Sequence, residues 1–269
     1  EVNIIVCVKP VPDPEKYNLL QLDPKTKRLV REGIPQVVNP SDKNAVELAL
    51  QLKEKHGGKV TIVSMAPPFA TEKLKECLAM GADEAYLLSD REFGGADTYS
   101  TSYTIMKGIE KAGLEYDLIL AGNESADGAT SHVPSQLGEW LDLPHVSNVS
   151  NVEVVGDKAV KLSKKIENGV VNYEVELPAV LAVERNSNTP RLVSAMGIIK
   201  AGKKPIEIYG KADIPDIDDS KLGLPGSPTQ PGELFVPDLK RNATPIEGDV
   251  DEIAAQIVAL IKKAAGGIA

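Results

Sequence analysis

Nearly continuous apolar runs alternate with helical patterns over the first 145 residues of the chain. The runs cover residues 2–8, 59–65, 84–90 and 116–122. Each run has the length of a strand and is apolar at successive positions, which is typical of strands that are buried on both faces of a sheet. Strands of this kind belong to parallel sheets that are covered by helices.

The segments between these runs repeat apolar residues at the spacing of an amphipathic helix. Residues 43–55 form the clearest case, with Ser41 or Asp42 as the expected N-cap and Gly57 just beyond the last turn. Further helices are expected over about 71–80 and 97–112, and after residue 132, where one stripe contains Val133, Leu137, Trp140 and Leu141. We therefore predict an α/β fold with a mostly parallel, doubly wound sheet.

The pattern changes after about residue 147. Short alternating runs linked by Gly-Asp and Asn-Gly predict an antiparallel hairpin addition, and residues 178–184 return as a buried strand. A proline-rich stretch follows over residues 210–248 and predicts an extended arm. The chain then ends in an amphipathic helix that Asp249 and Glu252 are expected to cap.

These changes suggest two domains. We expect an α/β domain over residues 1–209, and an arm with a terminal helix over residues 210–269. The apolar stripe of that helix must be buried either on its own domain or on a partner, and the pattern leaves both open.

Charge and cysteine content exclude several classes of protein. The net charge of −9 is unlike that of a nucleic-acid or anionic-membrane surface, which needs clustered basic residues. No apolar run approaches the roughly eighteen residues of a membrane span, so we expect no membrane insertion. The chain does not open like a signal peptide, and Cys7 and Cys77 are expected to be reduced and buried, as in a cytoplasmic protein.

Candidate chemistry concentrates in the polar turns that follow the strands, where open parallel sheets bind ligands. Two of these turns, at 94–98 (GGADT) and 121–132, precede helix N-termini, which favour anions. Topology alone leaves both a nucleotide-type ligand and ordinary polar turns open. The stretch GIIKAGKK lacks the Ser or Thr of a Walker motif, and no GxGxxG is present.

The chain offers no reactive group of its own. Its three histidines and two cysteines show no metal-ligand spacing, so we expect no metal site, and no GxSxG nucleophile motif occurs. A bound cofactor should therefore carry any reaction.

Taken together, these turns resemble the β subunit of electron-transfer flavoproteins over essentially the whole chain. The matching stretches are IVCVKPVPD, REGIPQVVNPSDKNAVELALQLKE, VTIVSMAPP, ALAMGADEAYLLSD, ILAGNESADGATSHVPSQLGEWLDLP and ELPAVLAVERNSNTPRLVSAMGIIKAGKKPIEI. The resemblance implies an adenine-nucleotide α-hydrolase-like α/β fold and a heterodimer with a larger α subunit that carries a redox-active FAD. It also implies an adenine nucleotide in this chain, which is AMP in ordinary members and a second FAD in electron-bifurcating members.

Two stretches make the chain look like the bifurcating type. DREFGGADTYSTSY (90–103) has a Gly-Ala-Asp-Thr turn that AMP-binding members lack, and ADGAT resembles the pyrophosphate-and-ribose loop of FAD-binding members. In that type, FAD accepts a hydride from NADH. One electron goes to ferredoxin or flavodoxin, and the other passes through the α-subunit FAD to an acyl-CoA dehydrogenase or a quinone-linked oxidoreductase.

The resemblance therefore implies FAD, with AMP as the alternative, and NADH oxidation only in a complex with the α subunit. A regulatory nucleotide-binding domain without redox work is a third possibility.

The contacts of the family can be carried over to individual residues. The implied adenine and ribose contacts are Cys7, Val8, Asn39, Asp42, Ser64 and Ala66. The implied phosphate contacts and their neighbours are Asp97, Thr98, Gly122, Asp127, Gly128, Ala129, Thr130, Ser131, His132 and Val133. Helix capping is an alternative role for Asn39 and Asp42.

Residues 185–200 resemble the recognition loop by which the β subunit binds an acyl-CoA dehydrogenase. Family members often place a Leu anchor in this loop, whereas Ala195 stands at the aligned position here, beside Met196. Met196 or Leu192 then substitutes for the anchor, or the redox partner differs. Arg191 belongs to the same implied partner-binding set, and the resemblance implies that the arm and terminal helix bind the α subunit.

Overall fold

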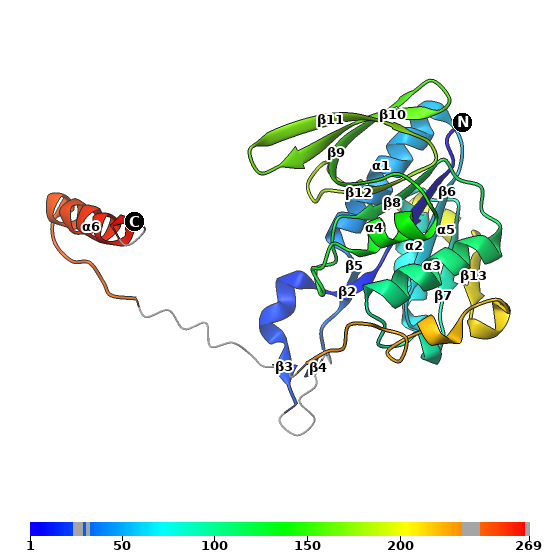
Figure 1. The fold of residues 1–269 in the computed structure, drawn as a ribbon, viewed down its shortest axis with the longest axis horizontal. Coiled ribbons are helices and arrows are strands. Elements are labelled where there is room, and N and C mark those ends of the chain that lie inside the picture. Colours follow the sequence, from blue (N-terminus) through cyan, green and yellow to red (C-terminus); the bar gives the residue numbers. More distant parts are fainter. Residues whose placement is uncertain (24–28, 31–32, 233–242, 267–269) are drawn as a thin grey trace. The chain divides into compact units, whose positions relative to one another are not determined.

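The computed structural model describes residues 1–23, 29–30, 33–232 and 243–266 (Figure 1). The chain forms two separate compact units, Glu1–Glu233 and Leu234–Ala269. The domain boundary that we expected after residue 209 therefore falls inside the first unit.

The first unit is built on a nine-stranded sheet with the order β11-β10-β9-β12-β8-β1-β6-β7-β13. Its strands are β1 (Ile4–Cys7), β6 (Val60–Met65), β7 (Glu84–Leu88), β8 (Leu118–Gly122), β9 (His145–Val155), β10 (Ala159–Ile166), β11 (Gly169–Glu176), β12 (Ala179–Val183) and β13 (Ile206–Tyr209). Neighbours from β9 across to β13 pair in parallel. The strands β9, β10 and β11 pair antiparallel and form the green extension in Figure 1.

This topology confirms the predicted fold class, including the hairpin addition and the returning strand β12. The sequence pattern did not indicate β13, which pairs with β7 at the edge of the sheet. None of its residues is fully buried, and the two middle ones are exposed, as expected of a strand at the edge of a sheet.

Helices cover both faces of the sheet. They are α1 (Pro40–His56), α2 (Thr71–Met80), α3 (Thr98–Ala112), α4 (Val133–Trp140) and α5 (Ala195–Ala201). Side chains of α1, α2 and α5 share one apolar core with Ile4 and Leu118, and those of α3 and α4 share a second core with Ile5 and Ile119. Successive strand residues thus enter opposite cores, which explains why the strands are apolar at every position.

The N-cap of helix α1 lies two residues before Ser41 and three before Asp42, the two predicted caps. Asn39 occupies the N-cap position and Pro40 the first turn, where a missing N–H costs nothing. Neither Ser41 nor Asp42 is the N-cap, so that prediction was wrong. The end of α1 at Gly57 is confirmed.

Short elements connect the main layers. The strand β2 (Pro10–Pro12) pairs with β5 (Gln36–Val38), and β3 (Gln21–Leu22) pairs with β4 (Leu29–Val30). The 3₁₀ turns are η1 (Pro14–Leu19), η2 (Pro68–Ala70), η3 (Arg91–Phe93), η4 (Lys211–Asp213) and η5 (Asp219–Lys221).

Residues 210–232 are not an extended arm. They fold onto α3, burying Ile214 and Leu222. Tyr103 Oη accepts a hydrogen bond from the Asp218 amide at 2.8 Å, and Lys107 pairs with Asp216 at 2.7 Å. The prolines prevent a regular helix here, but the interspersed apolar side chains still gain by burial. Of the rest of the predicted arm, residues 233–242 lie outside the described residues, and residues 243–248 form neither helix nor strand.

The second unit contains the helix α6 (Val250–Ala265). Asp249 and Glu252 form the predicted capping box, with mutual bonds of 3.0 and 2.9 Å. Among the described residues of the whole chain, no helix combines the length and apolarity needed to cross a membrane.

Candidate functional site

A cavity of about 1140 Å³ lies at the carboxyl ends of β1, β6, β7 and β8. This is the edge of a parallel sheet at which ligands bind. The volume exceeds the roughly 300–1,000 Å³ of most small-molecule sites, so the cavity can hold an extended ligand.

Most of the predicted cofactor contacts lie together here. The predicted residues that line the cavity are Cys7, Val8, Asn39, Asp42, Ala66, Asp97, Thr98, Gly122, Asp127, Gly128, Thr130, Ser131, His132 and Val133. Two predicted residues, Ser64 and Ala129, do not line it. The Ser64 hydroxyl is buried at the end of β6 and has no hydrogen-bond partner among the described residues.

One side of the cavity is the loop from β8 to α4, residues 122–133, which we call the β8–α4 wall. The amide side chain of Asn39 holds its backbone at two points, because Nδ2 donates to Glu124 O at 2.9 Å and Oδ1 accepts from Ala126 N at 3.0 Å. Ser41 Oγ adds a bond of 2.7 Å to the same Glu124 carbonyl. The side chain of Asn39 therefore positions this wall and does not cap α1.

Asp42 joins the β8–α4 wall to the end of β1. One carboxylate oxygen accepts from Lys9 N at 2.8 Å, and the other accepts from Gly122 N at 2.9 Å. Burial raises the pKa of Asp42 to about 7, although the N–H donors and the charge of Lys9 act in the opposite direction. A Cβ at residue 122 would lie 2.4 Å from Asp42 Oδ1, so this close approach requires glycine.

The β8–α4 wall ends at the N-terminus of α4. Ala129 and Ser131 have φ values of 48° and 59°, so the chain turns twice through the left-handed region before Val133 begins the helix. The first turn of a helix has N–H groups without intrahelical acceptors, and these favour an anion. The geometry can therefore hold a phosphate without a basic side chain.

The opposite side of the cavity is the turn 94–98 at the start of α3, which we call the α3 wall. Asp97 caps α3 by accepting from Ser100 N at 3.0 Å, and its second carboxylate oxygen accepts from Thr229 N at 2.9 Å. The Asp97 amide donates to Ser227 Oγ at 2.8 Å. The segment 223–229 thus fixes this wall from outside the sheet.

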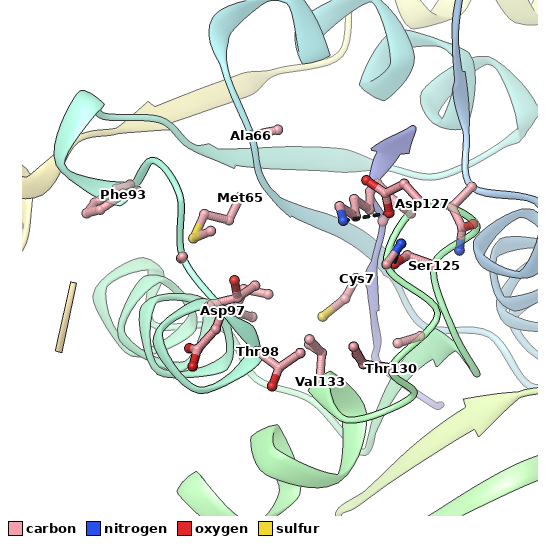
Figure 2. A pocket seen from close by; sticks show the side chains of 18 of the residues that line it. Cys7, Met65, Ala66, Phe93, Asp97, Thr98, Ser125, Asp127, Thr130 and Val133 are labelled. Carbon is pink, nitrogen blue, oxygen red and sulfur yellow. Dashed lines mark hydrogen bonds and ion pairs between the residues drawn. The ribbon is translucent and has the colours of Figure 1, made fainter. Parts of the chain in front are cut away.

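The two walls face each other across the end of β1. Figure 2 shows Asp97 and Thr98 on one side, Ser125 and Asp127 on the other, and the Cys7 thiol between them. Burial and the nearby Asp42 raise the pKa of Cys7 to about 12, so the thiol is protonated. Cys77 is likewise free and buried, as predicted.

Several lining residues were not among the predicted contacts. Met65 and Phe93 add apolar surface beside the α3 wall (Figure 2), and both directly neighbour predicted segments. Thr229 also lines the cavity. It lies in the proline-rich stretch, where no sequence pattern connects it with a strand end.

Lys9 is the clearest omission. Its ammonium group pairs with Asp127 Oδ1 at 2.8 Å. The β8–α4 wall itself contains no lysine or arginine, so Lys9 brings a positive charge to this wall from another part of the chain. Partial burial raises the pKa of Asp127, but the bond from Lys9 outweighs this and holds the pKa below its ordinary value. The sequence signal that could have identified Lys9 was its position two residues after β1, at a strand end where ligands bind.

The predicted partner-binding residues lie elsewhere, between β12 and α5. The side chain of Leu192 is 95% exposed, and Ala195 and Met196 are exposed at the start of α5. Arg191 differs, because its guanidinium is engaged with Glu47 and Glu54 of α1.

The chemistry of the cavity is that of a binding site. Its groups are polar and charged side chains, backbone amides, a protonated thiol and apolar side chains. Among the described residues, no cluster of His, Cys, Asp or Glu could hold a metal ion. The residues can bind and orient a nucleotide-sized ligand.

Comparisons with known proteins show what the whole chain is similar to. The model of the electron transfer flavoprotein domain family matches residues 26–214. The chain is 44% identical to the electron transfer flavoprotein subunit beta of Clostridium acetobutylicum, over 97% of this chain and 98% of the relative. It is 43% identical to the subunit of the same name from Thermoanaerobacterium thermosaccharolyticum, over 96% of each. It is also 43% identical to the caffeyl-CoA reductase-Etf complex subunit CarD of Acetobacterium woodii, over 97% of this chain and 98% of the relative.

Proposed function

The chain belongs to the electron transfer flavoprotein family as a β subunit, and we propose that its cavity holds FAD that accepts electrons from NADH. The observation that carries the proposal is one continuous cavity of about 1140 Å³ that reaches from the β8–α4 wall to the α3 wall. A mononucleotide would need only the first of these walls.

The lining suits the parts of a dinucleotide. The end of β1 and Ala66 leave room for a flat ring, and Gly122 lets the end of β8 lie close to Asp42 of α1. Met65, Phe93 and Ile105 provide an apolar surface at the other end.

The phosphates would lie between the two walls. We assign them to the amides at the N-termini of α4 and α3, with the hydroxyls of Thr98, Thr130 and Ser131. Asp97 already accepts two N–H groups, so its role in this proposal is to position the α3 wall. When bound, FAD supplies hydride and single-electron chemistry, and the chain binds it, orients it and shields it from water.

The partners follow from the same assignment. We propose that the chain works with an α subunit that carries a second FAD, and that α6 buries its apolar stripe on that subunit. Electrons would pass to ferredoxin or flavodoxin and to an acyl-CoA dehydrogenase or quinone oxidoreductase. The name of the A. woodii relative, a caffeyl-CoA reductase-Etf complex subunit, supports an enzyme that acts on CoA thioesters as one of the electron acceptors.

The flavin content of the complex tests this proposal. The chain is purified with its α subunit, the flavin is counted per heterodimer, and the nucleotides released on denaturation are identified. We expect two flavins, both reducible by NADH. One flavin with one released AMP would overturn the FAD assignment and support a structural nucleotide. No flavin at all would support a regulatory nucleotide-binding domain.

A further inference from the structure

A polar stripe runs along α1 on the side that faces the segment between β12 and α5. It consists of Asn44, Glu47 and Glu54. Asn44 and Glu47 are each only 4% exposed, and buried polar groups of this kind need partners. None of the three lines the nucleotide cavity, so the cavity does not explain them.

Asn44 pairs with Asn188 through three hydrogen bonds. Its Nδ2 donates to Asn188 O at 2.8 Å and to Asn188 Oδ1 at 2.9 Å, and Asn188 Nδ2 donates to Asn44 O at 2.9 Å. Asn44 Oδ1 also accepts from Asn186 N at 3.3 Å. Asn186 has a φ of 65°, a left-handed conformation that asparagine tolerates better than most residues.

Arg191 is held by two glutamates. Its backbone N and Nε donate to Glu47 Oε2 at 3.0 and 2.8 Å, and Nη2 donates to Glu47 Oε1 at 3.1 Å. Nη1 and Nη2 also pair with Glu54. Gln51 Nε2 donates to Glu47 Oε1 at 2.8 Å, which leaves the buried carboxylate well satisfied. A planar guanidinium makes such fork-like pairs, which a lysine cannot reproduce.

These contacts fix the chain directly beside an exposed apolar surface. Leu192, the next residue, is 95% exposed, and Met196 and Ile199 on α5 are 59% and 61% exposed. The other end of this surface is fixed too, because α5 lies against α2. A Cβ at Gly197 would come within 2.4 Å of Ala79 O, and Lys204 Nζ donates to Leu78 O at 3.0 Å.

We propose that Asn44, Glu47 and Glu54 are positioning residues that hold segment 186–191 so that Leu192 and Met196 are preorganised for docking to an acyl-CoA dehydrogenase. This inference rests on the proposed function, which names an acyl-CoA dehydrogenase as a partner, and on the docking role that the family resemblance implies for residues 185–200. Arg191 then acts as an internal anchor and not as a contact of the partner. An ordered docking segment loses less conformational entropy on binding, which is the physical gain.

Helix α1 thereby serves two sites. Its first turn holds the β8–α4 wall through Asn39 and Asp42, and its next turns hold the docking segment through Asn44 and Glu47. A change in the second set should leave nucleotide binding intact, which makes the two roles separable by experiment.

The test uses the complex with the α subunit and a purified acyl-CoA dehydrogenase that exchanges electrons with it. The double variant Glu47→Gln/Glu54→Gln removes both charges that face Arg191, and Arg191→Lys removes the fork while the charge stays. Glu72→Gln, which loses an exposed pair with Lys75 on α2, is the matched control. Leu192→Ser tests the docking surface itself.

We expect the KM for the dehydrogenase to rise about tenfold in the double variant and in Arg191→Lys, because several side chains must then be ordered on docking. The kcat, the flavin content and NADH reduction should not change, and neither should any value of Glu72→Gln. Amide hydrogen exchange in residues 186–191 should become faster in both anchor variants.

Two outcomes overturn the inference in different ways. If Leu192→Ser raises the KM but the anchor variants do not, docking occurs here and the positioning role of α1 is wrong. If Leu192→Ser leaves the KM unchanged, the docking role implied for residues 185–200 fails and this inference fails with it, whereas the FAD assignment is tested separately by the flavin count. Arg191→Lys decides the matter should the double variant not fold, because Arg191 is only partly buried.

Discussion

The two walls of the cavity are held in different ways. The β8–α4 wall is fixed by Asn39 and Asp42, which are 2% and 5% exposed and lie at the N-cap and in the first turn of a core helix. The α3 wall is fixed by Ser227 and Thr229, which lie in a segment that follows the last strand of the sheet. One wall is therefore part of the core, and the other is attached to it.

Because of this difference, substitutions in the two walls should have different effects on the stability of the fold and on the binding of a dinucleotide. Removing an anchor of the β8–α4 wall leaves buried N–H groups without partners, so it should damage the fold together with nucleotide binding. Removing an anchor of the α3 wall changes a partly exposed turn. It should affect mainly the half of the cavity that only a dinucleotide reaches.

Asp42→Ala should have the largest effect. It leaves the amides of Lys9 and Gly122 without acceptors, at about 1–3 kcal/mol each, and bound nucleotide should be lost. Urea unfolding and nucleotide content measure both consequences. Asp42→Asn, which keeps one acceptor, should lose less. An Asp42→Ala protein with unaltered stability would show that the β8–α4 wall is not anchored in the core as described.

The pH dependence of stability should show the burial of Asp42. Its pKa of about 7 in the folded state lies above the ordinary aspartate value of 3.8, so the folded state binds the proton more tightly. The contribution is complete below about pH 4 and is lost as the pH rises through 7, at about 1.4 kcal/mol per pH unit at most. The difference in unfolding free energy between wild type and Asp42→Asn should therefore shrink from pH 4 to pH 7. A constant difference would contradict the raised pKa.

Asp97→Ala should have a smaller effect on stability. The loss of the α3 cap costs about 1–2 kcal/mol, and the Thr229 amide loses its acceptor. Combined with Thr98→Ala, it should lower the flavin occupancy of this chain and leave the α-subunit flavin in place. Asp97→Asn is the matched control, since asparagine also caps helices. Unchanged flavin occupancy in the double variant would sink the assignment of phosphates to the α3 wall.

Lys9→Gln should change stability least. The Lys9 side chain is 49% exposed, and ion pairs with this exposure contribute about 0–1 kcal/mol. Thermal unfolding should hardly shift, and flavin should still bind, because amides and hydroxyls carry the phosphate site in our proposal. A loss of flavin in Lys9→Gln would show that the lysine binds the flavin directly, contrary to the proposal that backbone amides and hydroxyls hold the phosphates.

Much of the architecture could be predicted because it depends on local patterns. The apolar runs at β1, β6, β7 and β8 are continuous because both faces of the sheet are covered, and this periodicity is visible in any single run. The order of strands and helices then placed the polar turns on one edge of the sheet. Most of the predicted contacts line the cavity for this reason.

The predictions that failed concern residues whose role depends on distant partners. A run such as Ser41-Asp42 before an apolar stripe is typical of a cap, yet Asp42 reaches across to Gly122. Prolines in residues 210–232 suggested an arm, although Ile214 is buried and Leu222 packs into the core that α3 and α4 share. Neither contact leaves a trace in local spacing.

The sequence by itself determined the layers, the strands and the edge at which a ligand would bind, because periodicity and turn chemistry act over a few residues. Only the tertiary structure decided which side chains hold that edge in shape. Asn39 and Glu124, Asp97 and Thr229, and Glu47 and Arg191 are each far apart in the chain, and their hydrogen bonds form only after the sheet has brought their elements together. The positions of ligand-binding turns can thus be inferred locally, whereas the anchors that make those turns rigid are a property of the folded chain.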